Sequence, residues 1–536
     1  LGWAAMTQQS CEATRVRGVQ SDELYELRTA CLARWRSTFE YTTGRLAQLV
    51  PGQAEAARAL VEQQPPVATC EAEALRSSIA LRGMAASRTD RSRSPEASAA
   101  HDRIQGLLDH TRGERLLGTH ARALALARQA EHEARRMGLR YLEAEAIQLR
   151  VALEFDAGGS PRAQAELRRA LSLAVEADDP DTAALVVVRL LSLERLGAEP
   201  VADRVLLAAL GRSWAARTPR PAVLHAQIEF EEAHHAQERG DHEAALVRIG
   251  EARAALRKAG RAHDTIALEL RIIEGRSLLD LGRFESAERE LDELVSLMER
   301  RLPEGHIHLG DAAFYLASAR LERGKAEAAL PWARRAWTIY RDRLGPHDDK
   351  ALFARQLLAR CWWRRGDPGR AAAELEALVE TITGAYGELD ARLLFVLIEL
   401  AELELEVGEL GPARRHATRA VTIATRHYGA AHPVTAACGI TLAAVALGDG
   451  TLDLAQPLLQ AARLRVDASF DPLAPPRVSY LLARLALRTT PPDPERARRL
   501  TDEALAALRS HTSDEAARLR DTIEGLGHRT TLGLAP

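Results

Sequence analysis

Two groups of closely spaced histidines are the first candidates for metal chemistry. His234 and His235 are adjacent, with His242 further along, and His306 and His308 are separated by one residue. Neither group has the HExxH spacing that places two imidazoles on one face of a helix, and adjacent histidines point to different faces. The sequence therefore favours solvated or helix-capping histidines and predicts no metal ligand.

Residues that could serve catalysis are no better organised. The Arg-Gly-Lys sequence at 323–325 resembles part of a phosphate loop, but Ala319 stands where GxxxxGK requires its first glycine. Paired carboxylates such as Glu402 and Glu404 recur among 75 acidic residues, which is typical of solvated helix faces. GxGxxG, HRD and DFG motifs do not occur. The sequence predicts no catalytic residue, no cofactor and no enzymatic activity in this chain.

One constant interval governs the elements that carry these residues. Alanines recur every 42 residues, and five positions before the first six stand glycines. Small or aliphatic residues also recur seven positions after the alanines, and small residues recur seven positions before the glycines. Glycine often ends a helix and small residues let helices approach closely, so each unit is predicted to be a helical hairpin. The alanines are Ala245, Ala287, Ala329, Ala371, Ala413, Ala455 and Ala497, and the glycines are Gly240, Gly282, Gly324, Gly366, Gly408 and Gly450.

Further marks extend the pattern to both sides. An apolar residue is expected to anchor the chain before each loop, at Leu302, Leu344, Tyr386, Tyr428 and Phe470. Upstream the interval loosens around Gly118, Gly158 and Gly197. In the last unit Pro492 and Pro494 replace the turn glycine, where they end one helix and start the next.

This pattern resembles the tetratricopeptide repeat, and the 42-residue form with LG or YG before an HP-like loop resembles the repeats of kinesin light chains. The resemblance implies an all-α superhelix of about ten helical pairs over residues 103–526. A tail would follow at 527–536. It also implies a concave groove, lined by the first helix of each pair, that binds a protein or peptide. The ligand itself is not specified, because stacked repeats serve very many partners.

The groove positions implied by this resemblance lie two, three, six and ten residues before each turn glycine. Arg360, Trp363 and Arg364 share one helical turn and would suit a carboxylate and a planar side chain. Alternatively, these arginines pair with Glu402 and Glu406 and are structural. Lys and Asn do not stand where a terminal-carboxylate clamp of this family would need them. The residues assigned to partner binding are His234, Arg276, Phe314, Arg360, Trp363, Arg364, Glu402 and Glu406.

The first hundred residues follow another plan. Residues 1–84 are expected to form helices, with Ser21 as an N-cap, and the Ser/Arg-rich stretch 85–102 is expected to be a linker. CEATRVRGVQSDELYELRTACLARW and the later ATCEAEALRSS resemble the region between membrane helix and repeats in Hanks-type serine/threonine kinases of myxobacteria. The resemblance implies a parent protein with a kinase domain and one membrane helix. The opening LGWAAMTQQSCEAT likewise suggests part of a longer protein.

The five cysteines leave the compartment open. Cys11, Cys31 and Cys70 lie in the N-terminal segment, and Cys361 and Cys438 lie inside repeats. Free, buried thiols are the favoured interpretation, whereas a Cys11–Cys31 bridge would suit an extracytoplasmic location. No CxxC pair supports zinc binding or redox catalysis.

Composition agrees with an all-helical interaction protein. Aromatic residues are only 4% of the 536, and the formal net charge is −3, so nothing calls for nucleic acid. No apolar run is long enough to insert in a membrane. We expect the regulatory region of a membrane-bound bacterial serine/threonine kinase, which would lie on the extracytoplasmic side. The alternative is a free-standing, cytoplasmic tetratricopeptide regulator or receptor for signalling peptides.

Overall fold

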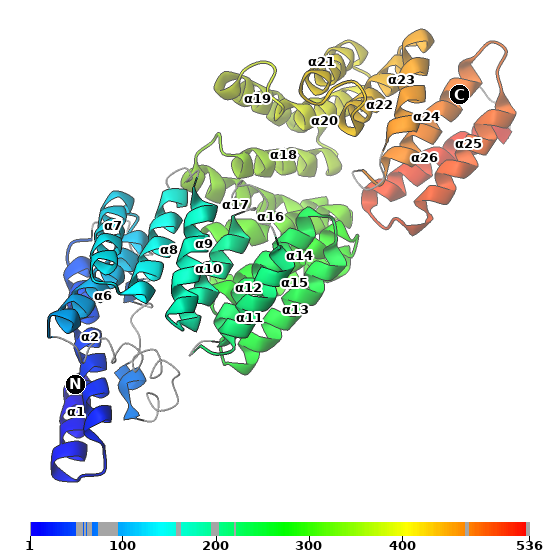
Figure 1. Cartoon of the computed structure of the whole chain (residues 1–536). Coiled ribbons are helices and arrows are strands. Elements are labelled where there is room, and N and C mark those ends of the chain that lie inside the picture. The colour runs from blue at the N-terminus through cyan, green and yellow to red at the C-terminus, as the bar shows by residue number, and fades with distance from the viewer. Residues whose placement is uncertain are drawn as a thin grey trace. The chain divides into compact units, whose positions relative to one another are not determined.

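Helices make up all the regular structure that is described. The computed structural model describes residues 2–49, 57, 60–61, 67–72, 95–156, 162–193, 203–218, 221–466 and 471–531, and no strand occurs among them. Successive helices pack against their sequence neighbours, as Figure 1 shows. The expected all-α solenoid with an N-terminal helical cap is confirmed.

In the part of the chain that the structure describes, the array consists of ten helical pairs followed by a single helix, α26 (Asp514–Thr531). The pairs are α6 (Pro95–Leu116) with α7 (His120–Arg136), α8 (Arg140–Asp156) with α9 (Ala163–Glu176), α10 (Pro180–Ser192) with α11 (Arg204–Ala215), α12 (Pro221–Glu238) with α13 (His242–Lys258), α14 (Thr265–Asp280) with α15 (Phe284–Glu299), α16 (Ile307–Glu322) with α17 (Ala326–Leu344), α18 (Asp349–Arg364) with α19 (Pro368–Tyr386), α20 (Leu393–Glu406) with α21 (Leu410–Tyr428), α22 (Pro433–Gly448) with α23 (Leu452–Arg465) and α24 (Ala474–Arg488) with α25 (Pro494–Ala507).

Two element boundaries differ from those expected. Helix α6 begins at Pro95, so residues 95–102, assigned to the linker from composition, are helical. Residues 85–94 of that linker lie outside the described residues. Helix α26 continues to Thr531, beyond the expected end of the array at 526. In both places the local composition did not show that the helix extends further.

The turn glycines lie where the repeat pattern puts them. Gly366 has φ +92° and Gly324 has φ +72°, a left-handed conformation that costs glycine little and strains other residues. Gly118, Gly240, Gly282, Gly408 and Gly450 also have positive φ. Gly158 and Gly197 lie outside the described residues. The sequence at 323–325 is thus a repeat turn and forms no phosphate loop.

Small residues form the contacts between helices. All seven alanines of the 42-residue series are fully buried. At Gly275, which replaces alanine in the equivalent series on the first helices, a Cβ would lie 2.5 Å from Leu291 Cδ2. Close approach of helix axes therefore depends on these positions, and each pair buries its apolar side against its neighbours.

The apolar residues expected to anchor the chain before the loops are partly exposed where the structure describes them. The exposed fraction is 43% for Leu344, 40% for Tyr386 and 45% for Tyr428. Tyr386 instead reaches the preceding loop, where its hydroxyl donates a hydrogen bond to the carbonyl of His347 over 2.7 Å. These residues end the second helix of a pair and project over a loop, so they tie repeats together from outside. Phe470 lies outside the described residues.

The chain divides into two compact units. The first contains residues 1–239 and 244–270, and the second contains residues 240–243 and 271–536. Each is described by itself. The second contains seven of the eight residues assigned to partner binding, and only His234 belongs to the first.

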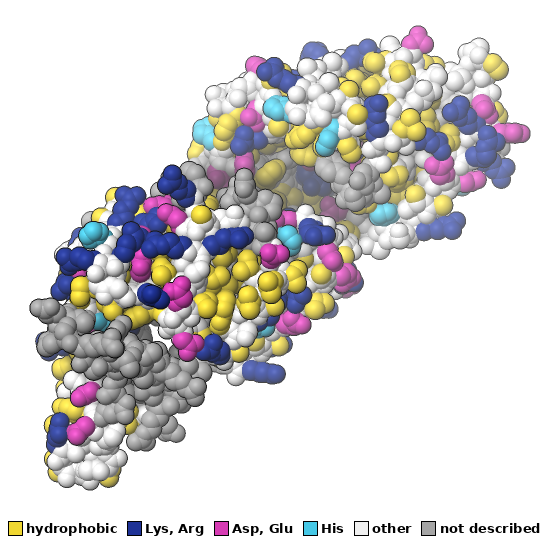
Figure 2. Space-filling view, in the orientation of Figure 1, with side chains coloured by type: hydrophobic (Ala, Val, Ile, Leu, Met, Phe, Trp, Pro, Cys, Tyr) yellow, Lys and Arg dark blue, Asp and Glu magenta, His cyan; other side chains and the backbone are white. Residues whose placement is uncertain are grey.

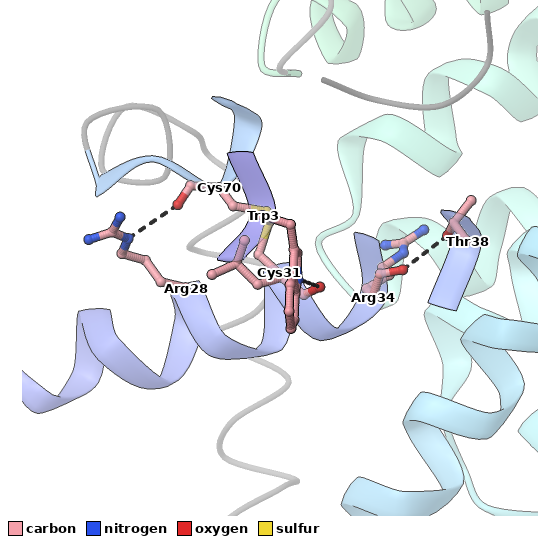
Figure 3. The surroundings of a disulfide bond; sticks show 7 residues. Trp3, Arg28, Cys31, Arg34, Thr38 and Cys70 are labelled. Atoms are coloured by element: carbon pink, nitrogen blue, oxygen red, sulfur yellow. Dashed lines mark hydrogen bonds between the residues drawn. A yellow bond between two sulfur atoms is a disulfide. The ribbon is translucent and has the colours of Figure 1, made fainter. Parts of the chain in front are cut away.

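An N-terminal module precedes the array in the first unit. It contains α1 (Gly2–Cys11), a π-helix (Glu12–Val16), α2 (Asp22–Leu46) and a 3-10 turn (Val67–Cys70). Ser21 caps α2 as expected, since its hydroxyl accepts a hydrogen bond from the Leu24 amide. Figure 3 shows Trp3 of α1 beside α2, with its indole nitrogen 2.9 Å from the Leu32 carbonyl.

The cysteine pairing differs from both interpretations of the sequence. Cys31 is bonded to Cys70, while Cys11 is free and exposed. Cys11 ends α1 on its exposed side, whereas Cys70 is brought onto α2 by the 3-10 turn and is fully buried there. Arg28 on α2 also donates a hydrogen bond to the Cys70 carbonyl over 3.3 Å. Proximity in sequence thus pointed to the wrong partner for Cys31.

Helix α2 packs directly on α6, the first helix of the array. Arg34 donates two hydrogen bonds to Asp109, at 3.1 and 3.0 Å. The Tyr41 ring stacks on His110 with centroids 4.2 Å apart. Arg45 pairs with Glu114, whose side chain is fully buried. The module therefore covers the end of the array as a cap.

Candidate partner-binding site

The first helices of the pairs form the inner side of the second unit. Neighbouring first helices contact one another, as α16 does α18, α20 does α22 and α22 does α24. Among the described residues, successive second helices make no comparable contacts with each other. A curved stack has its layers closest on the concave side, so the first helices line a concave face. We call the exposed side of α14, α16, α18, α20 and α22 the inner face.

Arg360 connects three helices across the inner face. From α18, its Nη2 lies 3.4 Å from Glu322 Oε1 on α16, and its Nε lies 3.6 Å from Glu399 Oε1 on α20. Burial alone would lower the pKa of the Arg360 guanidinium, but Glu399 and Glu322 raise it overall. The arginine is thus permanently charged and shared by two carboxylates.

Glu399 is the most perturbed carboxyl group of the inner face. Burial raises its pKa to about 7, and Glu402 adds to the rise, while Arg360 and Gln356 act in the opposite direction. Its Oε2 atom is buried and accepts no hydrogen bond from the residues that the structure describes. This carboxyl group therefore titrates near neutral pH.

Trp363 and the acidic residues of α20 form a second set of contacts between repeats. The Trp363 indole nitrogen donates a hydrogen bond to Glu406 Oε2 over 2.9 Å. Glu402 accepts a hydrogen bond from the Thr441 hydroxyl of α22 over 3.2 Å. The arginines were expected to pair with Glu402 and Glu406, and this is wrong, because Arg360 pairs with Glu322 and Glu399 instead.

Arg364 has charged neighbours of both signs. Burial, then Arg518 and Arg360, lower the pKa of its guanidinium, and Asp514 and Glu322 raise it. Within the described residues its ion pair is with Glu515 of α26, at 3.8 Å. The guanidinium also lies 5.2 Å from the centre of the Trp363 ring.

Two exposed phenylalanines extend the inner face and were missed in the sequence. Phe353 on α18 is 54% exposed and Phe395 on α20 is 48% exposed. They are 42 residues apart and seven residues before Arg360 and Glu402, so they lie on the same side of their helices. Both would have been found if the series of groove positions had been extended by one more helical turn toward the start of each first helix. Apolar surface of this kind, ringed by charged groups, suits a protein partner.

The remaining assigned residues make other contacts, and Arg276 also interacts with Tyr315 on α16. Arg276 lies 3.7 Å from Asp280 on its own helix, α14. Phe314 is partly buried against the core between α16, α17 and α18. His234 lies edge-on to Phe230 in the first unit, with ring centres 4.7 Å apart. None of the three adds to the set around Arg360.

Neither the histidines nor the buried thiols show reactive chemistry. His306 is the N-cap of α16, as the capping interpretation allowed, and accepts a hydrogen bond from the His308 amide. In the described ranges no three His, Cys, Asp or Glu side chains meet as metal ligands. Burial raises the pKa of Cys361 and of Cys438 to about 12, which keeps both as thiols.

Charges of both signs are mixed on the face of the molecule that Figure 2 shows. Figure 2 shows basic and acidic side chains interspersed with apolar ones on the face in view. No helix in the described part of the chain is both long and apolar enough to cross a bilayer. The inner face carries both charged hydrogen-bonding groups and exposed phenyl rings.

Comparison with known proteins gives a likeness of fold. No family model and no curated protein matches the chain. Among solved structures, nearly identical TPR-like repeats of a Podosopora anserina kinesin light chain are 19% identical, covering 38% of this chain and 96% of that one, with a TM-score of 0.35. A Rap protein in complex with Competence and Sporulation Factor is 11% identical, covering 68% and 99%, with a TM-score of 0.41.

A third similar structure is a signal-transduction ATPase from Pyrococcus horikoshii that has a tetratricopeptide repeat sensor. It is 15% identical, the match covers 71% of this chain and 55% of that one, and the TM-score is 0.46. These structures share helical repeats with this chain. Its function has to be argued from its own residues.

Proposed function

We propose that this chain is a scaffold that binds a protein or peptide segment on the inner face of its second unit. The observation that carries the proposal is the pair of exposed phenylalanines, Phe353 and Phe395, in register on adjacent first helices. Large apolar side chains are normally covered, and an exposed pair beside organised charges is typical of an interaction site.

The charged groups would supply orientation. Arg360 and Trp363 are already held by Glu322, Glu399 and Glu406, so their side chains lose little rotamer freedom when a partner binds. The phenyl rings would supply the apolar contact, and a partner that covers them would remove them from water. Recognition of a segment that carries both an apolar and a charged residue follows from this arrangement.

The test is a capture experiment with matched aromatic substitutions. The double variant Phe353→Ala, Phe395→Ala should lose partners that the unchanged chain retains from its source cell extract. Tyr386→Ala, Tyr428→Ala removes two equally exposed aromatic rings from the second helices and should retain them. The charge variant Arg360→Glu, Arg364→Glu should also lose binding. Equal capture by all variants would contradict the proposal.

A finer proposal is that the scaffold is the sensor region of a membrane-bound bacterial serine/threonine kinase. The N-terminal sequence resemblance to that class of kinases supports it. The Cys31–Cys70 disulfide lies within the resembling segment, and such bonds persist in oxidising compartments outside the cytoplasm. Partner binding would then be passed on to a kinase domain by dimerisation or by reorientation of the repeats.

This finer proposal has a direct test. The gene sequence before Leu1 should encode HRD and DFG motifs followed by one apolar span of about 20 residues. A reading frame without them would contradict the kinase role and leave the alternative of a free-standing regulator. Alkylation without reductant should label Cys11 and spare Cys31 and Cys70 in protein from an oxidising compartment.

A further inference from the structure

The beginning of the last helix lies against inner helices far away in sequence. Thr512, just before α26, donates a hydrogen bond to the carbonyl of Gly282 over 3.3 Å, across 230 residues. Asp514 lies so close to the α16–α17 turn that a Cβ at Gly324 would be 2.9 Å from its Oδ1. Glu515 reaches Arg364 on α18. The end of the second unit thus contacts the inner face of its beginning.

These contacts differ from those that hold α26 in the fold. Ala516 and Ile523 of α26 are fully buried among Leu473, Ala504 and Leu508 of the terminal pair. The contact with α14, α16 and α18, in contrast, is made by polar side chains at one edge. Helix α26 is therefore a firm part of the terminal pair, and its contact with the inner face is a separate, weaker one.

The charges at this contact are incompletely matched. Glu515 is shared, since it also forms a close ion pair with Arg477 of α24. Asp514 is engaged by Arg518 at 2.8 Å. Arg364 has Glu515 at 3.8 Å. Burial, Arg518 and Arg360 lower the pKa of its guanidinium, whereas Asp514 and Glu322 act in the opposite direction. A better placed carboxylate would be favoured over the existing one.

We propose that Arg364 binds an acidic side chain of the partner, and that Glu515 occupies the same position beside Arg364 in the free protein. The proposal rests on the function proposed above and specifies its chemistry. The partner would present carboxylates on consecutive residues, as Asp514 and Glu515 do, and an apolar residue further along its chain, because Phe353 lies eleven residues, about 16 Å, before Arg364 on α18. Binding of the acidic segment and the contact of α26 with α18 then exclude each other.

The chain itself supplies a probe. A labelled peptide with the sequence of residues 509–524, RSHTSDEAARLRDTIE, is titrated with the full chain and followed by fluorescence anisotropy. Glu515→Gln in the protein removes the competitor and should tighten binding by about threefold, the effect of one weak ion pair. Arg364→Gln should weaken it by about tenfold, as expected for a lost charged hydrogen bond.

Four controls separate this mechanism from general electrostatics. Glu388→Gln removes an exposed carboxylate that pairs with Arg419 on a second helix and should change nothing. A peptide with Asn and Gln in place of the two carboxylates should bind none of the proteins measurably. In the Arg364→Gln protein, Glu515→Gln should give no gain. Arg364→Lys keeps the charge and should retain part of the affinity if Arg364→Gln proves unstable.

Hydrogen exchange tests whether peptide binding breaks the contact of α26 with α18. Amides of residues 510–516 should exchange faster when the peptide is bound, because the contact with the inner face is broken. No tightening by Glu515→Gln, or equal binding of the neutral peptide, would overturn the inference. If capture still depends on Phe353 and Phe395 in that case, the scaffold function stands and only the acidic partner is wrong.

Discussion

The contacts between helices and the inner face of the second unit differ in how regularly their residues recur along the chain. Ala413 and its equivalents recur every 42 residues and are fully buried, so one small residue serves the same purpose in each repeat. In the neighbouring repeats Ser318 and Glu402 stand at the position of Arg360, and Glu322 and Glu406 stand at that of Arg364. Each arginine has its own partners. The comparison shows that stability resides in what the repeats share, and recognition in what they do not.

The largest effect is expected where the shared positions are changed. Ala413→Asp places an unpaired carboxylate and extra volume in a fully buried site. The free energy of unfolding should fall by about 4 kcal/mol or more. Thr418→Asp, on the exposed side of the same helix, should change it by less than about 0.5 kcal/mol. Urea unfolding followed by circular dichroism measures both, and similar values would remove the distinction.

The next effect concerns a group of the inner face and depends on pH. The pKa of Glu399 is about 7 in the folded chain, above its ordinary value near 4.3. The native state therefore holds this proton between pH 4 and 7 when the unfolded state has lost it, and stability falls as pH rises through that window. The fall is up to about 3 kcal/mol. Glu399→Gln should remove it and Glu388→Gln should not, as thermal unfolding from pH 5 to 8 will show.

A smaller effect on the free energy of unfolding is expected at two glycines of the same repeat. Gly366 has φ +92°, so Gly366→Ala should cost about 1 kcal/mol through backbone strain. Gly384 lies within α19 with open space around it, and Gly384→Ala should stabilise by about 0.5 kcal/mol. Opposite signs in chemical unfolding are the expected result. Equal signs would show that the turn does not need its glycine.

The smallest effect on stability belongs to the exposed phenylalanines. Phe353→Ala removes a ring that is already 54% exposed, so the free energy of unfolding should change by less than about 1 kcal/mol. Its effect on partner capture should be large by comparison. A strong loss of stability would place this ring in the framework and would contradict its role in binding.

The interval of 42 residues was sufficient to predict the framework. Gly324, Gly366 and the buried alanines could be assigned because each repeat imposes the same backbone conformation and the same close approach. The element boundaries at Pro95 and Thr531 were less well predicted, since composition does not show whether a helix end is packed. The assigned groove residues stay predictions, although Arg360, Trp363 and Arg364 do share one side of α18.

The sequence by itself determined the helical hairpins and their stacking, because burial of small residues between helices follows a local period. Only the tertiary structure decided the pairing of Cys31 with Cys70, the bridge from Arg360 to Glu322 and Glu399, and the reach of Glu515 to Arg364. Those contacts join residues from separate elements. Their geometry depends on how far the stack curves, and no period in the sequence records that curvature.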